Sequence, residues 1–422
     1  MLGLGFGLAV IVGSTLGIGI LRTPGLVAGQ LSSPSAVLVV WLAGGLYTLL
    51  GAVCFAELGT MLPGAGGYYT YARHAFGNAV GFAVGWTDWL TYCSVLGYVS
   101  IGFAEFAGTL VPALAPRVTI VAIAVLAALV ALQWAGVQVS SRFQQVATAV
   151  KFAAFLAVVV AAFVIPHSPI ARGTPPAVTV TGLVVALQAV VITYGGWQSA
   201  LYFTEEDRDP NTNIPRSMIG GIAAVIVVYL LVNAALLSVL SIARMAASTL
   251  PAADAAAVLI GRRGGQLITV LSLISLPPML NAILMIGTRI LFAMGRDGLL
   301  WRRTAAVGPR GTPTVATLVT TIVAAALIAT GSFQRLVAIT AFFLALNYGI
   351  CCLALFVLRR REPARLRPFA AWGYPWSAAI VLAGAIALLA GMLMGDTVNG
   401  AFALGLLGAG FIVRAKPAVR AT

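Results

Sequence analysis

The sequence predicts an all-α integral membrane protein with twelve transmembrane helices, of which the first and the sixth are broken. Three observations predict this fold. Of the 422 residues, 60% are hydrophobic and only 9% are charged, and the mean hydropathy is +1.02, whereas a soluble domain has about 25% charged residues. Apolar runs of the roughly 20 residues that cross a bilayer recur along the chain. Two of these runs contain clustered glycines near their middle.

The basic residues indicate how the chain is oriented. The clusters Arg302–Arg303 and Arg359–Arg361 follow even-numbered spans, whereas Arg262–Arg263 lies in a longer outer loop and is an exception. Since cytoplasmic loops carry an excess of Lys and Arg, we expect both termini in the cytoplasm and the chain in the cytoplasmic (inner) membrane. This distribution explains the net charge of +14 without nucleic acid, which we do not expect as a partner. The expected spans are residues 2–29, 36–61, 78–112, 118–137, 144–166, 180–203, 216–242, 265–292, 314–331, 334–358, 373–394 and 397–414.

The first span contains a glycine-rich run, Gly13-Ser14-Thr15-Leu16-Gly17-Ile18-Gly19, where a helix should be continuous. Its glycines and hydroxyl residues lower helix propensity and leave backbone groups without helical partners. Irregular backbone at membrane depth persists only where it is buried in protein or lines a cavity, so the run predicts a binding site. The alternative is that Gly13 and Gly17, at GxxxG spacing, only allow close helix packing.

The sixth span repeats this feature, because Tyr194-Gly195-Gly196-Trp197 interrupts an apolar run. The two breaks are five helices apart, and an odd number of crossings makes the second block enter the membrane from the opposite side. Spans 1–5 and 6–10 are therefore predicted to form an inverted repeat, which favours a site over simple packing. We expect the repeats to cover residues 1–166 and 167–372, followed by two accessory helices and a cytoplasmic tail over residues 373–422.

Broken helices offer both partial charges that an α-amino acid requires. We expect the substrate carboxylate to bind backbone N–H groups from Leu16 to Gly19, and the ammonium group to bind carbonyls near Gly13 and between Ile192 and Gly195. The candidate substrate-binding residues are Ser14, Thr15, Leu16, Gly17, Ile18, Gly19, Ile192, Tyr194, Gly195, Gly196 and Trp197.

Two charged residues lie deep in expected spans. Lys151 is the only lysine within a span, and we expect it about seven residues in from the cytoplasmic loop, roughly 10 Å deep. A buried ammonium group needs partners, so Lys151 is a functional candidate, with snorkelling to the interface as the alternative. Asp88 lies about ten residues into its span; it carries a proton, complements a cationic substrate or only accepts interhelical hydrogen bonds. Glu57 and Glu105, near span ends where the interface solvates them, are expected to be structural.

Other polar residues suggest no further chemistry. His74 and His167 are expected in loops, without metal-ligand spacing, so we expect no metal and no cofactor. No nucleophile–base pair or metal-binding set occurs within the spans, which argues against a membrane-embedded enzyme. The loops are too short for the soluble domain of a sensor. The acidic run of residues 205–209 is expected to be a solvated loop that forms gating pairs with cytoplasmic arginines.

Motifs along nearly the whole chain resemble those of the amino acid–polyamine–organocation (APC) superfamily, and most closely its L-type amino acid transporter branch and bacterial relatives. Residues 13–21, followed by Pro24, resemble the signature G-[ST]-x-x-G-x-G-I-[FL]. Residues 57–71 resemble the element E-L-G…P…G-G-x-Y. Residues 194–215 resemble Y-G-G-W…E-E…[ND]-P…N-[IL]-P, the most specific match, and residues 289–299 resemble the end of the eighth span.

The resemblance implies a leucine-transporter-like 5+5 inverted repeat with alternating access and sodium-independent amino acid transport, by exchange or proton-linked uptake. It also implies that Lys151 takes the place of a cation and bridges the first helix and Ser275. Together with Asp88 these residues are the candidates for coupling. Because Asp88 is the only acid deep within a span, we expect a small or neutral amino acid. The alternative is a cationic amino acid or a polyamine, for which Asp88 would have to face the pocket.

The chain departs from the family pattern at several positions. Ile18 stands where a small residue, often Ser, is found, and Ile192 stands where L-type members have Phe. Pro277-Pro278 replaces a glycine-containing turn and is expected to kink the eighth span. The outer loop of residues 113–118 has no cysteine, so no disulfide-linked heavy subunit is expected. The expected partners are the amino acid substrate and the lipid bilayer.

Overall fold

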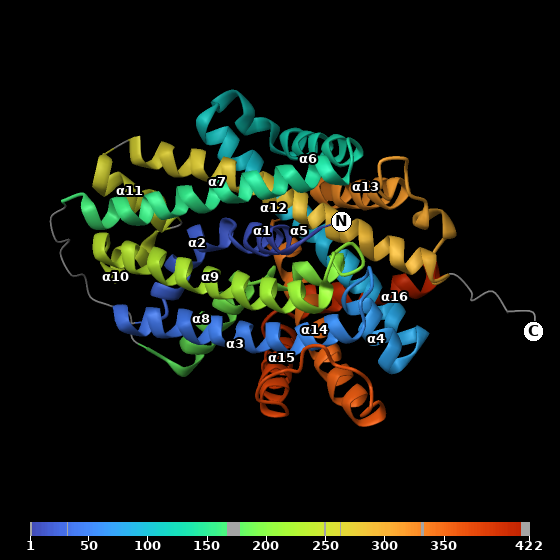
Figure 1. The fold of residues 1–422 in the computed structure, drawn as a ribbon. Helices are drawn as coiled ribbons and strands as arrows, with labels where there is room; N and C mark the ends of the chain where they lie inside the picture. The colour runs from blue at the N-terminus through green and yellow to red at the C-terminus, as the bar shows by residue number, and fades with distance from the viewer. Residues whose placement is uncertain are drawn as a thin grey trace, which may run out of the picture.

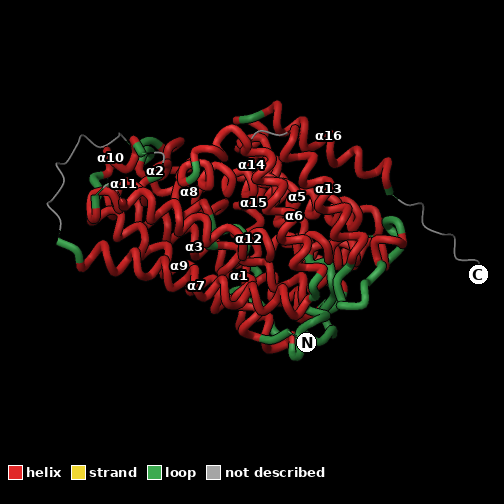
Figure 2. The backbone as a smooth tube through the Cα atoms, turned by 90° about the horizontal axis from the view of Figure 1, so that it is seen from above, coloured by secondary structure: helices red, strands yellow, loops and turns green. Residues whose placement is uncertain are grey.

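The computed structural model describes residues 2–31, 33–166, 178–248, 250–261, 263–330 and 333–414. Its elements are helices joined by short connections (Figure 2). Figure 1 shows α10 and α11 at one end of the bundle, and α4 and α16 at the other, with the N-terminus nearer the second end. We call these the α10–α11 end and the α4 end. His167 lies outside the described residues.

Ten spans of the described chain are long and apolar enough to cross a membrane, if the bent pair α1 and α2 is taken as one span. Two further apolar helices of 17 residues each, α13 and α16, occupy the positions of the ninth and twelfth expected spans. The prediction of an all-α membrane protein is confirmed. The spans are α1 (Leu4–Thr15) with α2 (Ile18–Ala28), α3 (Pro34–Met61), α5 (Asn78–Leu110), η1 (Pro112–Arg117) with α6 (Val118–Trp134), α7 (Val137–Val164), α8 (Val180–Thr193) with η2 (Trp197–Phe203), α9 (Pro210–Val239), α12 (Arg263–Arg296), α13 (Thr314–Thr330), α14 (Phe333–Arg361), α15 (Trp376–Gly395) and α16 (Thr397–Val413).

The short helices correct two expectations. The connection between α9 and α12, expected as a loop, contains α10 (Ile242–Ala247) and α11 (Pro251–Ile260), and η3 (Arg302–Ala305) precedes α13. His74 lies in α4 (Tyr68–Phe76) rather than in a loop, and its ring nitrogen is 2.7 Å from a Glu362 oxygen. Hydropathy alone does not detect α10 and α11, because both are far shorter than a span.

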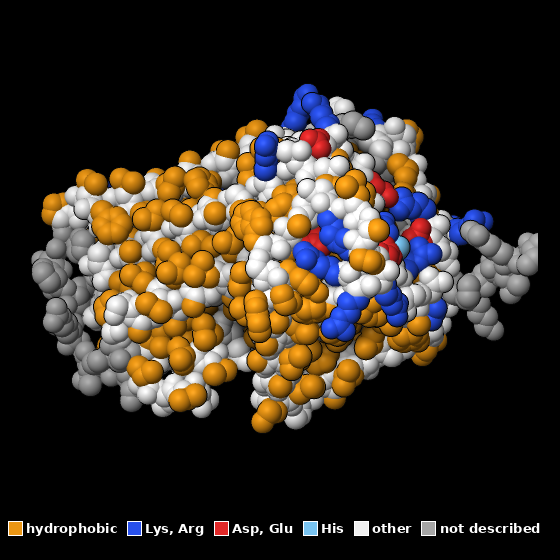
Figure 3. Space-filling model, turned by 60° about the horizontal axis from the view of Figure 1, so that its bottom comes forward, with side chains coloured by type: hydrophobic (Ala, Val, Ile, Leu, Met, Phe, Trp, Pro, Cys, Tyr) orange, Lys and Arg blue, Asp and Glu red, His pale blue; other side chains and the backbone are white. Residues whose placement is uncertain are grey.

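Large apolar side chains on the outside of the bundle show which surface faces lipid. Val39, Ile120, Val180 and Ile412 are 63%, 67%, 83% and 87% exposed. Apolar side chains cover much of the face in Figure 3, whereas Lys and Arg side chains on that face gather toward the α4 end. Such an extensive exposed apolar surface is typical of a protein embedded in a membrane.

Helix α7 begins earlier than hydropathy predicts, at Val137 rather than near residue 144. Its first two turns carry polar side chains, which lower the hydropathy of that window. Two of them are buried against α12: the Ser140 hydroxyl donates to Asn281 Oδ1 at 2.9 Å, and Asn281 Nδ2 donates to Gln144 Oε1 at 3.0 Å. Interhelical hydrogen bonds therefore satisfy groups that would otherwise be costly at this depth.

Two further expectations concern α12 and α3. Helix α12 runs from Arg263 to Arg296 with Pro277 and Pro278 inside it, and the kink expected there stays a prediction. Glu57, expected to be solvated, is completely buried near the end of α3. Its carboxylate accepts hydrogen bonds from Arg359 at 2.9 and 2.5 Å and from the backbone N–H of Ala371 at 2.7 Å. The ion pair therefore fastens α3 to the end of α14, consistent with a structural role.

Candidate functional site

The first predicted break is present. Helix α1 ends at Thr15 and α2 begins at Ile18, with a bend of 47° between them. Leu16 and Gly17 have extended backbone, so the helical hydrogen-bond pattern stops at these two residues. A Cβ atom on Gly17 would lie 2.5 Å from the Met279 sulfur, so glycine allows the close approach of α12. The side chain of Ile18 lies outside what the structure describes.

The second break meets the first one directly. Helix α8 ends at Thr193, and after a turn the chain continues as the 3-10 helix η2. Gly196 in this turn has φ +117°, and a Cβ atom there would lie 2.9 Å from backbone atoms of Ser14 and Thr15. Only glycine fits both requirements. The Ser14 hydroxyl completes the contact, 3.0 Å from the Gly196 carbonyl oxygen and 2.8 Å from the Ser199 hydroxyl.

Tyr229, which sequence reasoning missed, joins the two breaks. Its hydroxyl on α9 lies 2.7 Å from the Thr15 carbonyl oxygen and 3.2 Å from the Thr193 carbonyl oxygen, at the last residues of α1 and α8. These carbonyls have no partner within their own helices. The ring packs against Trp41 and Tyr194, with centroids 5.3 and 4.8 Å away. The only sequence signal is an aromatic residue within an otherwise aliphatic stretch.

A cavity of about 390 Å³ lies where the two breaks meet. Its lining is rich in hydroxyl groups, and several predicted residues contribute to it, whereas Leu16, Tyr194 and Trp197 are buried away from it. Residues that sequence reasoning missed come from α2, α5, α8, η2, α12 and α14. The predicted lining residues are Ser14, Thr15, Gly17, Gly19, Ile192, Gly195 and Gly196; the missed ones include Arg22, Thr23, Thr91, Tyr92, Tyr98, Thr193, Gln198, Ser199, Met279, Phe333 and Thr340.

Within this lining, two polar side chains differ in how they are satisfied. Both ends of the Gln198 amide have a partner, because Gln198 Nε2 donates one hydrogen bond to the Tyr92 hydroxyl at 3.3 Å and its oxygen accepts from the Gly196 N–H at 3.2 Å. The Thr15 hydroxyl oxygen is buried and has no hydrogen-bond partner among the described residues. A buried polar group without a partner carries a free-energy cost, which a polar ligand in the cavity would remove.

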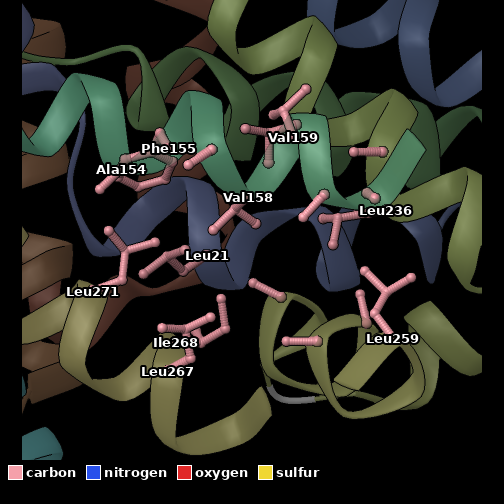
Figure 4. Close-up of a pocket in the computed structure, with 18 of the residues that line it drawn as sticks. Leu21, Ala154, Phe155, Val158, Val159, Leu236, Leu259, Leu267, Ile268 and Leu271 are labelled. Carbon is pink, nitrogen blue, oxygen red and sulfur yellow. The ribbon is translucent and has the colours of Figure 1, made fainter. Parts of the chain in front are cut away.

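A second cavity, of about 290 Å³, is chemically different. Figure 4 shows aliphatic and aromatic side chains from α2, α7, α9, α11 and α12 pointing into it, among them Leu21, Phe155, Leu236 and Ile268. Every lining residue is apolar. This cavity offers no hydrogen-bonding side chain for a zwitterion, so we place the candidate site at the helix breaks.

Lys151 contacts the first helix beside the break. Its Nζ atom donates a 3.0 Å hydrogen bond to the Gly13 carbonyl oxygen, its only hydrogen bond to the described chain. Lys151 is fully buried in the middle of the 28-residue helix α7. The expected depth of about seven residues is therefore wrong, because α7 begins earlier, and snorkelling is excluded by this burial. On the same face of α7, the Thr148 hydroxyl donates to the Ala9 carbonyl at 3.2 Å.

The structure does not join Ser275 to Lys151. The Ser275 hydroxyl donates to the Leu271 carbonyl oxygen of its own helix at 2.6 Å, and no contact with Lys151 is found in the described part of the chain. Of the two contacts that the resemblance implies for Lys151, the one with the first helix is therefore present, and the one with Ser275 is not found among the described residues. The coupling role of both residues stays a prediction.

Asp88 lies behind the cavity rather than in its lining. It is fully buried in α5, and the Tyr202 hydroxyl of η2 donates to one carboxylate oxygen at 2.7 Å. The other oxygen has no hydrogen-bond partner within the described ranges. Tyr202 packs edge to face against Tyr92, which does line the cavity, with ring centroids 5.5 Å apart. Asp88 therefore does not contact the cavity itself and is connected to its lining through Tyr202 of η2.

Toward the α4 end, ion pairs join α12 to the segment that follows η2. Arg289 on α12 is buried and donates two hydrogen bonds to Glu206, at 2.5 and 2.7 Å. The backbone N–H of Leu2 donates to the Glu206 carbonyl at 2.8 Å, so the segment before α1 also contacts this region. Arg296 and Glu205 form a second, exposed pair at 2.9 Å. The acidic run thus forms the expected pairs with arginines.

A bundle of membrane-crossing helices with a cavity between two helix breaks is the architecture of a membrane transporter. A family model described as amino acid permease matches residues 7–412. The chain therefore belongs to the amino acid permease family of the APC superfamily, as its motifs predicted, and it is a membrane transporter of amino acids.

Curated relatives cover most of the chain. It is 27% identical over 408 residues to the serine/threonine exchanger SteT of Bacillus subtilis (strain 168), which covers 94% of this chain and 92% of that protein. It is 30% identical over 375 residues to the Asc-type amino acid transporter 1 of Mus musculus, covering 85% and 70% of the two chains. Identity to the human b(0,+)-type amino acid transporter 1 is 28% over 386 residues, covering 87% and 77%.

Proposed function

We propose that this protein is a sodium-independent carrier of small neutral amino acids that works by alternating access. The observation that carries the proposal is the cavity at the meeting point of the two helix breaks, with the unpartnered Thr15 hydroxyl in its wall. The first N–H groups of α2, from Gly17 to Gly19, have no acceptor within the helix and suit a carboxylate. Carbonyls at the ends of α1 and α8 suit the ammonium group.

The rest of the cavity favours a small substrate that donates hydrogen bonds. Hydroxyl-bearing residues line it on α5 (Thr91), α8 (Thr193), η2 (Ser199) and α14 (Thr340). The hydroxyls of Thr91, Thr193 and Thr340 donate to carbonyls of their own helices, so their oxygens serve as acceptors. Serine, threonine and alanine match this lining, and a serine/threonine exchanger is among the relatives. The cationic alternative required Asp88 to face the pocket, and Asp88 is not among the residues that line it.

Lys151 supports sodium independence. Its Nζ atom donates to the Gly13 carbonyl beside the break at 3.0 Å, so the Lys151 amino group lies where the family resemblance places a bound cation in sodium-coupled relatives. Lys151, Ser275 and Asp88 remain the candidates for coupling to a proton or to a counter-substrate.

In alternating access, one end of the cavity would open as the other end closes. The Arg289–Glu206 pair closes the α4 end, whereas the lining at the other end includes Leu26 and Arg22, both partly exposed. Opening the α4 end requires separation of α12 from the segment after η2. Binding of substrate to both breaks would bias this equilibrium, since only differential contacts shift a population.

The gathering of basic side chains toward the α4 end supports a cytoplasmic position for that end, with both termini inside and the chain in the inner membrane. The repeats over residues 1–166 and 167–372, followed by residues 373–422, stay a prediction. All four cysteines are buried, which supports the expectation that no second subunit is joined by a disulfide. We expect neither enzymatic activity nor a cofactor.

A thermal-shift screen of the purified protein tests the proposal first. Serine, threonine, alanine, arginine and putrescine are compared in sodium and in potassium buffer, because a ligand that binds only the folded state raises the melting temperature. We expect stabilisation by the small neutral amino acids, equal in both buffers. Counterflow of labelled serine in proteoliposomes then shows transport. Stabilisation that requires sodium, or that only arginine or putrescine produces, would contradict the proposal.

A further inference from the structure

One charged side chain faces the candidate substrate cavity. Arg22 on α2 is the only ionisable Lys, Arg, Asp or Glu residue among the described residues that line it. It lies three positions after Gly19, at the start of the second half of the broken helix. The neighbouring Thr23 hydroxyl is 2.8 Å from the Thr193 hydroxyl, which fixes this turn of α2 against α8. Arg22 therefore places a positive charge in the cavity wall close to the break.

One carboxylate and two aromatic rings surround the guanidinium group of Arg22, and the carboxylate is only loosely paired with it. Arg22 Nη2 is 3.4 Å from Glu105 Oε2, a long contact between side chains that are 38% and 42% exposed. Exposed pairs of this kind contribute little. The rings of Phe106 and Phe333 lie 5.7 and 5.6 Å from the guanidinium carbon, from α5 and α14. Both rings present their faces to the cation.

The donors of Arg22 are mostly uncommitted. A guanidinium group has five N–H donors, and Glu105 takes one of them, with no other hydrogen-bond partner of Arg22 in the described part of the chain. Glu105 itself is not among the lining residues. A substrate in the cavity is therefore exposed to the positive member of the pair rather than to the negative one.

We propose that Arg22 sets the charge selectivity of this carrier, rejecting amino acids with a cationic side chain and admitting neutral ones. The inference rests on the proposed function, because it assumes that the substrate binds between the two breaks. A neutral amino acid is a zwitterion with no net charge, whereas a cationic one brings an additional positive charge into the same cavity. Two like charges in a partly desolvated site repel each other much more strongly than in water.

The experiment compares two inhibitors of nearly equal size in proteoliposomes. Homoserine and 2,4-diaminobutyrate differ chiefly in a side-chain hydroxyl against an ammonium group, and each competes with labelled serine. The measured quantity is the ratio of their inhibition constants. We expect wild type to prefer homoserine, and Arg22→Gln to reduce that preference roughly tenfold, because the repulsion is removed. Glu105→Gln, which leaves Arg22 unpaired, should increase it.

Three controls make the outcome decisive. Arg244→Gln removes an exposed positive charge on α10 that does not line the cavity, and it should leave the ratio unchanged. Arg22→Lys keeps the charge and should keep the preference, which separates charge from packing. In wild type, high salt should weaken the discrimination, since the pair is half-exposed. An unaltered ratio in Arg22→Gln with intact serine transport overturns this inference alone. Failure of wild type to transport serine or any other amino acid overturns the proposed function instead.

Discussion

The Lys151 ammonium group donates a 3.0 Å hydrogen bond to the carbonyl oxygen of Gly13, from the middle of α7 to the last turn of α1 before the break. Both groups are buried. The bond links a helix that is continuous across the membrane to one that stops at mid-depth. It therefore supports the broken helix at the point where its own hydrogen-bond pattern ends.

We predict that Lys151→Ala abolishes net serine transport or uncouples it from its driving gradient. The Gly13 carbonyl would be left without this donor in a buried position, at a cost of about 1–3 kcal/mol in unfolding free energy. Serine uptake and its pH dependence in proteoliposomes measure the effect. Val150→Ala on the lipid-facing side of the same helix is the matched control, because Val150 is 50% exposed. If Lys151→Ala transports serine at the wild-type rate and with the wild-type pH dependence, Lys151 has no role in coupling.

Gly196→Ala is expected to disrupt the junction of the two breaks. The backbone has φ +117°, and the added Cβ atom would lie 2.9 Å from the backbone of Ser14 and Thr15. Either α1 moves away from η2 or the turn changes its conformation, so serine affinity should fall by at least roughly tenfold, equivalent to about 1.4 kcal/mol. Thermal shift with serine and the KM for serine transport both report this loss.

The comparison variant is Gly408→Ala in α16, where a Cβ atom meets nothing within 4 Å. Alanine replaces glycine in an open helical position there, so stability should stay equal or rise by about 0.5–1 kcal/mol. Serine binding of the two variants at equal strength would show that the contact between the breaks is not needed for the site.

The two breaks were predictable because their causes are local. Glycines and hydroxyl residues at mid-span remove helix propensity whatever surrounds them, and Lys151 is conspicuous as a charge within an apolar run. The depth of Lys151 was wrong because Ser140 and Gln144 lower the hydropathy of a segment that is nevertheless helical. Their polarity is satisfied by Asn281 on another helix, which a window along one segment does not include.

Residues that act through tertiary contacts were missed for the same reason. Tyr229 is distinguished by its hydroxyl position between α1 and α8, and Arg22 by its place in the cavity wall. Neither position can be read from neighbours in the sequence. Asp88 was correctly predicted to lie deep within a span. Its position behind the cavity lining could not be predicted, because the Tyr202 that contacts it lies more than one hundred residues further along the chain.

Tyr229→Phe tests the connection between the breaks. The ring keeps its packing, but the carbonyl oxygens of Thr15 and Thr193 lose their shared donor. We expect the serine KM to rise roughly threefold to tenfold, in line with the loss of about 0.5–1.5 kcal/mol for one hydrogen bond. Steady-state serine uptake gives the KM and the maximal rate separately.

Tyr47→Phe is the control for Tyr229→Phe. It also removes a hydroxyl that donates to a carbonyl, at 2.9 Å to Val381, but this bond joins α3 to the accessory helix α15. Its effect should appear in the melting temperature and not in the serine KM. Equal KM changes in both variants would mean that Tyr229 contributes only general stability.

The final prediction compares the two glutamates at the α4 end. Glu206→Gln leaves Arg289, whose side chain is 5% exposed, without its anionic partner. Glu205→Gln removes one anionic partner of Arg296, which is 43% exposed and still lies 3.7 Å from an Asp297 oxygen. Breaking a buried pair is much more costly than breaking a surface pair, which is worth about 0–1 kcal/mol. The closed α4 end should therefore loosen in Glu206→Gln only. Hydrogen–deuterium exchange measures this loosening: the backbone amides of residues 2–8 and of η2 should exchange faster in Glu206→Gln and at the wild-type rate in Glu205→Gln. The two variants exchanging alike would show that the Arg289–Glu206 pair does not hold this end closed, and alternating access would then need a different closing contact.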